Sequence, residues 1–104
     1  MYGVFAGRLA DAVAIAEMAL QTAFGYRAND NYGGGEYGLF ENADGLEAMV
    51  YMNYHPVEED WIHPECRGTP YMLSLYGPEG LVTEVMQRIE RARIPAKVLT
   101  LLQS

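Results

Sequence analysis

The stretch that decides the fold is residues 71–102, which reads YMLSLYGPEGLVTEVMQRIERARIPAKVLTLL. Its apolar start, Tyr71–Tyr76, predicts a strand that the following Gly-Pro pair ends. Apolar residues then recur at helical spacing over 79–93, with acidic residues early and arginines late, as the helix dipole favours. An Ile-Pro pair ends that helix, and residues 96–102 predict a last strand. A strand–helix–strand unit of this kind demands a right-handed crossover with both strands in one sheet.

The N-terminal part predicts a second helix of the same kind. Residues 8–24 carry apolar side chains at helical spacing and are rich in alanine, which suits a helix packed closely on a sheet. Gly25 stands where a left-handed residue often ends a helix. Residues 2–6 form a short apolar run between glycines, which we interpret as a short strand rather than as the lead-in to the helix.

A glycine-rich segment, residues 28–35, predicts a loop. The spacing Gly33-x-Gly35-x-x-Gly38 formally matches the dinucleotide-binding motif, but that motif needs a strand before it and a helix after it. Here a polar loop precedes the glycines and a predicted strand, residues 36–41, continues from them. We therefore expect no nucleotide site and no other cofactor.

A hairpin is predicted where residues 36–41 meet residues 46–55 through the turn Asn42-Ala-Asp-Gly45. Alternation in the second strand separates a core face from a mixed face. The expected core face is Leu46, Ala48, Val50, Met52 and Tyr54; the other is Glu47, Met49, Tyr51, Asn53 and His55. On the second face we expect Glu47, Tyr51, Asn53 and His55 to be hydrated or at an interface.

The element order is (β)αβββαβ, within one compact domain over residues 1–104. Two helices and four or five strands predict an α/β (α+β) two-layer sandwich with both helices on one face of a mixed, mostly antiparallel sheet. This order is like the ferredoxin-like plan with one additional strand, an analogy of fold alone that carries no function.

Charge is distributed unevenly along the chain. The formal net charge is −7, and residues 28–66 contain nine acidic residues with no Lys or Arg. Four of the seven bases fall within residues 88–97. Such an acidic segment repels phosphate and attracts basic protein surfaces, so nucleic-acid binding is not expected. A high net charge is also explained by solubility alone.

The number of cysteines and the distribution of apolar residues indicate the cellular compartment. The chain has one cysteine, Cys66, which cannot form an internal disulfide, so the fold needs no oxidising environment and a cytoplasmic location is expected. The first residues place apolar side chains before the first charge, the reverse of a secretory signal. The apolar run at residues 12–16 is far too short to span a membrane.

The stretch His55–Cys66 gathers the chemistry-bearing residues: both histidines, the only tryptophan and the only cysteine. His55, His63 and Cys66 are possible zinc ligands, but only half of a paired structural motif is present, so we expect an ordinary polar loop and no metal. A Cys66–His63 nucleophile pair is not favoured either, because nearby carboxylates raise a thiol pKa and no orienting group or oxyanion hole is indicated. No catalytic motif is assembled, so an enzyme is not expected.

Aromatic residues among carboxylates instead indicate a surface that recognises a basic protein. The residues expected to contact this partner are Glu58, Glu59, Asp60, Trp61, Tyr54, Tyr51, Tyr37, Glu41 and Asp44. The function expected is that of a small acidic binding protein that neutralises a toxin or a defence protein, as an immunity protein, an antitoxin or a phage-encoded inhibitor does. Two alternatives stay open: the aromatic residues fill the core, or the chain is a ferredoxin-like small-molecule-sensing domain that dimerises through an exposed sheet face bearing Met49 and Tyr51.

Overall fold

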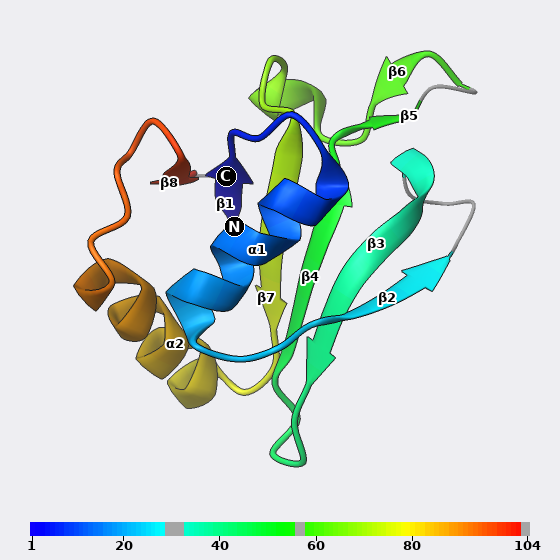
Figure 1. Cartoon of the computed structure of the whole chain (residues 1–104). Helices are drawn as coiled ribbons and strands as arrows, with labels where there is room; N and C mark the ends of the chain where they lie inside the picture. The colour runs from blue at the N-terminus through cyan, green and yellow to red at the C-terminus, as the bar shows by residue number, and fades with distance from the viewer. Residues whose placement is uncertain (29–32, 56–57, 103–104) are drawn as a thin grey trace.

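A computed structural model describes residues 1–28, 33–55 and 58–102 of the 104-residue chain. Figure 1 shows the helices packed against a sheet, with a small hairpin at one end. The elements in chain order are β1 (Tyr2–Val4), α1 (Leu9–Leu20), β2 (Gly25–Ala28), β3 (Gly33–Glu41), β4 (Glu47–Met52), β5 (Tyr54–His55), β6 (Asp60–Trp61), a 3-10 turn (Pro64–Cys66), β7 (Tyr71–Tyr76), α2 (Glu79–Arg91) and β8 (Leu99–Leu101).

The main sheet has six strands in the order β2-β3-β4-β7-β1-β8, and each pair of neighbouring strands is antiparallel. The prediction of a compact α+β architecture is confirmed. The predicted sheet differs from the observed one, because four or five strands in a mixed sheet were expected. The strand that the sequence did not reveal is β2, which pairs with β3 over Gly25–Ala28. All four of its residues are exposed, so it carries no alternation of buried and exposed side chains to mark it.

The strand–helix–strand crossover expected at the C-terminus is present and connects β7 to β8, but the two strands are not neighbours, because another strand lies between them in the sheet. Both β7 and β8 pair antiparallel with β1, which lies between them, so β7 and β8 run parallel to each other. α2 makes the connection, as Figure 1 shows. The β8 strand, Leu99–Leu101, is shorter than the predicted 96–102, and it forms one edge of the sheet.

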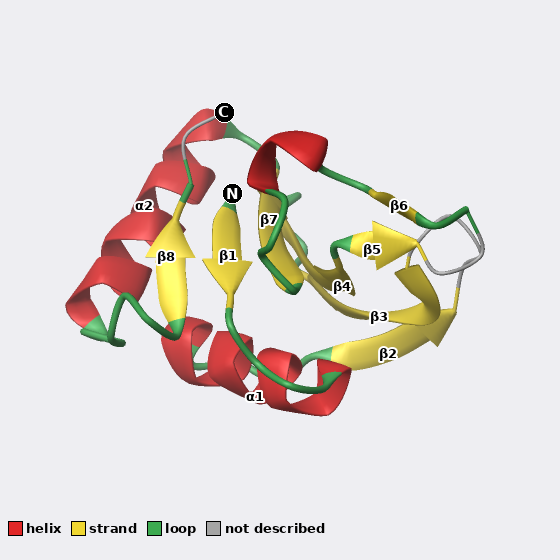
Figure 2. Ribbon diagram, turned by 90° about the horizontal axis from the view of Figure 1, so that it is seen from above, coloured by secondary structure: helices red, strands yellow, loops and turns green. Residues whose placement is uncertain are grey.

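Both helices cover the same face of the curved sheet (Figure 2). The main core lies between the helices and the sheet. It is built from buried residues of α1, from Val85 and Ile89 of α2, and from the inward-facing residues of the strands. Leu46, Ala48 and Val50 belong to this core and the half-buried Met52 packs against it, as the alternation predicted. Tyr54, expected on the same face, instead belongs to the separate β5–β6 sheet. α1 sits very close to β3: a Cβ on Gly38 would lie 2.8 Å from Cγ2 of Val13.

The other face of the sheet carries a second apolar cluster of Met49, Tyr51 and Met72. Partly buried residues, among them Ile62 and Cys66, pack against this cluster. The expectation that Tyr51 and Asn53 are hydrated or at an interface was wrong, because their side chains are 2% and 0% exposed. Residues 62–66 cover this face, and a strand's own pattern does not reveal a cover supplied by another segment. Met49 is buried too, so the dimer face expected of the alternative function is not open at these residues.

Three further boundaries differ from the sequence prediction. α1 ends at Leu20, and the left-handed residue that follows it is Gln21 (φ 55°) rather than Gly25, which begins β2. The predicted strand 46–55 is divided into β4 and β5 at Asn53. Of the loop predicted over 28–35, Ala28 belongs to β2 and Gly33–Gly35 belong to β3. The rest of that loop, 29–32, lies outside the described residues.

Among the residues that the structure describes, no helix is long and apolar enough to cross a membrane.

Candidate functional site

The segment singled out by its composition forms a second, two-stranded sheet at one end of the molecule. β5 and β6 pair antiparallel, with Tyr54 opposite Trp61 and His55 opposite Asp60. The rings of Tyr54 and Trp61 meet edge to face, with centroids 5.4 Å apart and planes at 68°. Such a pair stabilises a hairpin beyond the area that it buries, so these two rings hold the acidic tip in place.

The tip of this hairpin presents three exposed carboxylates, Glu58, Glu59 and Asp60. Glu59 has φ 52°, a left-handed conformation in the turn. The backbone N–H of Glu58 donates to Nδ1 of His55 at 3.3 Å, and that of Trp61 donates to Oδ1 of Asp60 at 2.8 Å. Local hydrogen bonds therefore hold the tip, and its negative charge faces solvent.

A hollow beside the hairpin, here called the aromatic pocket, has a volume of about 440 Å³. Its lining comes from the β1–α1 connection, the end of β4, the small hairpin and the start of β7, as Ala6, Gly7, Met52, Tyr54, Trp61, Pro70 and Tyr71. Burial, and then the charge of Asp11, raise the pKa of Tyr71 above its ordinary value. A carboxylate of α1 thus acts on one residue of the pocket wall.

Asn53 fixes the segment that follows the hairpin. Its buried side chain donates through Nδ2 to the carbonyl of Cys66 at 3.1 Å and accepts at Oδ1 from the N–H of His63 at 2.9 Å. Its backbone N–H donates to the carbonyl of Pro70, and its carbonyl accepts from the N–H of Ile62. Because a buried amide must satisfy its polar atoms, this residue locks residues 62–70 onto the sheet.

His63 takes part in a chain of polar contacts that leads into the protein. Its Nε2 lies 2.6 Å from the hydroxyl of Tyr51, which lies 2.9 Å from Oγ of Ser74. Nδ1 of His63 lies 3.3 Å from Oε1 of Glu65. A carboxylate beside Nδ1 favours the tautomer with the proton there, so Nε2 accepts from Tyr51. Both ring nitrogens are therefore engaged away from the Cys66 thiol, and the Cys–His pair considered above is not assembled.

The possible metal ligands have other contacts in the structure. Within residues 1–28, 33–55 and 58–102, no group of three or more His, Cys, Asp or Glu side chains could hold a metal ion. Nδ1 of His55 accepts from the Glu58 backbone, and the half-buried Cys66 packs in the second apolar cluster.

The partner-contacting residues predicted from the sequence fall into separate places. Tyr54, Glu58, Glu59, Asp60 and Trp61 belong to the hairpin, while Glu41 and Asp44 lie at the β3–β4 turn at the opposite end of the sheet (Figure 1).

β4 separates the two ends, and its six residues span roughly 17 Å at about 3.3 Å per residue. Tyr37 is half-buried on β3, and Tyr51 is buried with its hydroxyl in use.

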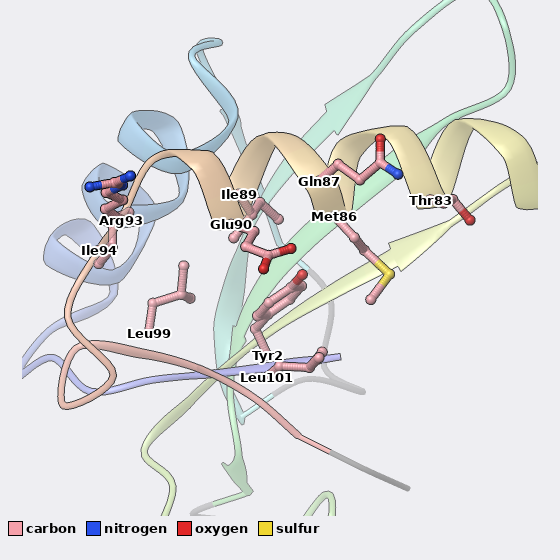
Figure 3. Close-up of a pocket in the computed structure, with 10 residues that line it drawn as sticks. All are labelled: Tyr2, Thr83, Met86, Gln87, Ile89, Glu90, Arg93, Ile94, Leu99 and Leu101. Carbon is pink, nitrogen blue, oxygen red and sulfur yellow. The ribbon is translucent and has the colours of Figure 1, made fainter.

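A larger groove of about 580 Å³ runs between α2 and the edge strand β8. Figure 3 shows Tyr2 on its floor with the carboxylate of Glu90 directed toward the Tyr2 ring, and Arg93 at one end. Burial, and then the charge of Glu90, raise the pKa of Tyr2. The rest of the lining is largely apolar: Met86, Ile89, Ile94, Leu99 and Leu101, with Thr83 and Gln87.

Composition singled out residues 55–66, but these were expected to form an ordinary polar loop, and neither the β5–β6 hairpin nor the pocket beside it was predicted. Ala6, Gly7 and Tyr71 come from segments far from residues 54–61 and carry no functional pattern of their own. Comparison of the chain with protein-family models gives no match, and comparison with curated proteins and with solved structures gives no significant match.

Proposed function

We propose that this protein is a small, acidic, non-catalytic binding protein that neutralises a basic protein partner, as an immunity protein, an antitoxin or a phage-encoded inhibitor does. The observation that carries the proposal is the juxtaposition of three exposed carboxylates with an apolar aromatic pocket on one hairpin. Carboxylates accelerate the encounter with a basic surface, and a desolvated aromatic pocket supplies affinity.

The contact surface proposed here consists of Tyr54, Glu58, Glu59, Asp60 and Trp61, and it is called the hairpin surface below. It is narrower than the set expected from the sequence. Tyr51 is left out because it is 2% exposed, and Tyr37 because it packs against the second apolar cluster. Glu41 and Asp44 are left out because they lie at the far turn, between β3 and β4. We also propose a cytoplasmic location, because the single cysteine is free and the fold needs no disulfide.

The alternative function, a ferredoxin-like small-molecule-sensing domain that acts as a homodimer, is supported by the groove between α2 and β8. The order β4-β7-β1-β8 with two helices on one face agrees with that plan, and we propose the fold as a variant extended by β2 and β3. A dimer in size-exclusion chromatography without any partner would favour this alternative, whereas a monomer favours the binding protein.

The test uses two variants with equal charge. E58Q/E59Q/D60N neutralises the hairpin, and E41Q/D44N/E47Q neutralises the far turn; each changes the formal net charge from −7 to −4 (−7 + 3). Partners captured from the native host by the unchanged protein are offered to both variants.

We expect the hairpin variant to lose the partner and the turn variant to keep it. Equal loss in both variants would show that only net charge matters, and full retention by the hairpin variant would place the contact surface elsewhere.

A further inference from the structure

We propose that the aromatic pocket receives the side chain of one arginine of the partner. This inference rests on the proposed function and names the chemical group that the hairpin surface recognises. Its basis is a pocket whose walls are aromatic and whose surroundings are negatively charged, a combination that suits a cation with a flat apolar face.

The walls fit a guanidinium group. Tyr54, Trp61 and Tyr71 line the pocket together with Met52 and Pro70, so three of its seven lining residues have aromatic rings. Tyr54 and Trp61 stand at 68° to each other, which gives the pocket a corner with ring surfaces of different orientation. Arginine stacks on aromatic faces and is less strongly hydrated than lysine, so it loses less on leaving water.

The charges around the pocket oppose an anion and favour a cation. Asp60 is adjacent to Trp61, Glu58 and Glu59 complete the tip, and Asp11 acts on the Tyr71 hydroxyl from α1. A positive charge, Arg8, also lies near Asp11. Its side chain is 78% exposed, and its Nε lies 3.4 Å from Oδ2 of Asp11. An exposed pair of this kind is weak, so the surroundings remain negative.

A purely apolar occupant is the competing possibility, and the neutral analogue of arginine separates the two. N-acetyl-L-arginine amide and N-acetyl-L-citrulline amide have side chains of nearly the same shape, and only the first is charged. Each is titrated into the full chain at constant ionic strength. Binding is followed by the fluorescence of Trp61, the only tryptophan, and by the amide signals of Gly7 and Tyr71 in heteronuclear NMR.

We expect the arginine compound to bind with a dissociation constant on the order of 1 mM and to perturb all three reporters. The citrulline compound should bind at least about tenfold more weakly, since the cation–aromatic and charge interactions are lost. Trp61→Leu, followed by the amide signals, should weaken arginine binding by roughly fivefold or more. E58Q/E59Q/D60N should weaken it several-fold, and E41Q/D44N/E47Q should leave it unchanged.

Equal affinity for the two compounds, or perturbation of none of the three reporters by the arginine compound, would overturn the inference, and neither result depends on a variant that might misfold. The test also stands apart from that of the proposed function. Loss of the captured partner in the hairpin variant without arginine binding to the pocket would leave the proposed function standing and remove this inference. Arginine binding to the pocket without any captured protein partner would remove the proposed function and, with it, the partner as the source of the arginine.

Discussion

Trp61 packs edge to face against Tyr54 across the small β5–β6 hairpin, with ring centroids 5.4 Å apart. Both side chains are half-buried, and both line the aromatic pocket. The contact therefore connects the stability of the acidic tip to the shape of the pocket, and the emission of the only tryptophan reports on it directly.

Removing the Tyr54 ring should expose Trp61. In Tyr54→Ala we expect the tryptophan emission to shift to longer wavelength, because the indole loses its cross-strand neighbour and becomes more hydrated. Tyr54→Phe keeps the ring and should leave the emission near that of the unchanged protein. An unaltered spectrum in Tyr54→Ala would show that the two rings do not pack together in solution.

Asn53 should contribute more to stability than its size suggests. Asn53→Ala leaves the carbonyl of Cys66 and the N–H of His63 without their side-chain partner, and we expect a loss of about 2–4 kcal/mol in the free energy of unfolding. Chemical denaturation measures it.

The matched control is Asn42→Ala in the exposed β3–β4 turn, where the Asn42 Oδ1 accepts from the N–H groups of Asp44 and Leu46. Solvent can replace those bonds, so a loss of only about 1 kcal/mol is expected. Equal losses at the two positions would contradict the role assigned to Asn53.

The residue after α1 offers a stabilising substitution. Gln21 has φ 55°, a conformation that costs an L-residue roughly 1–2 kcal/mol and glycine almost nothing. After allowing for the greater freedom of glycine in the unfolded chain, Gln21→Gly should raise the free energy of unfolding by about 0.5–1 kcal/mol. The same exchange at Ala92, with φ −68° after α2, should lower it by a similar amount. A loss of stability in Gln21→Gly would show that the left-handed conformation is not strained.

Alkaline pH should destabilise the fold through two tyrosines. Burial raises the pKa of both Tyr2 and Tyr71 above the ordinary value of 10.0, with Glu90 and Asp11 as the second causes.

Each hydroxyl therefore keeps its proton more firmly in the folded state. The associated stability is fully present below pH 10.0 and is lost as the pH rises through the folded pKa. Tyr71→Phe and Tyr2→Phe should flatten the fall in unfolding free energy above that pH, and Tyr76→Phe, at an exposed tyrosine, should not. An unchanged slope in all three variants would contradict the burial of these hydroxyls.

Strong local patterns made much of the fold predictable. The run Tyr71–Tyr76, the periodic helix that follows it, and the turn Asn42–Gly45 each combine hydrophobic spacing with residues that favour a boundary. β2 was missed because an exposed edge strand has no such pattern. The break at Asn53 depends on bonds to residues at 62–70, which only the tertiary structure supplies.

The candidate site was predictable to a smaller extent. Charge and aromatic content singled out Glu58–Trp61 as a candidate contact surface, since those properties belong to one continuous stretch. The pocket combines this stretch with Tyr71 and with Ala6 and Gly7, and the cover over Tyr51 comes from residues 62–66. Each of these contacts joins distant segments, so periodicity and composition do not contain them.

The measurement that tests the central claim most directly is the association rate constant between this protein and its captured partner as a function of ionic strength. Steering by exposed carboxylates predicts a steep fall in that rate as salt rises, because the Debye length shortens from about 10 Å at 0.1 M to about 3 Å at 1 M. The salt dependence should be reduced in E58Q/E59Q/D60N and nearly preserved in E41Q/D44N/E47Q. A rate that is insensitive to salt, or equally sensitive in both variants, would contradict recognition of a basic partner by the hairpin surface.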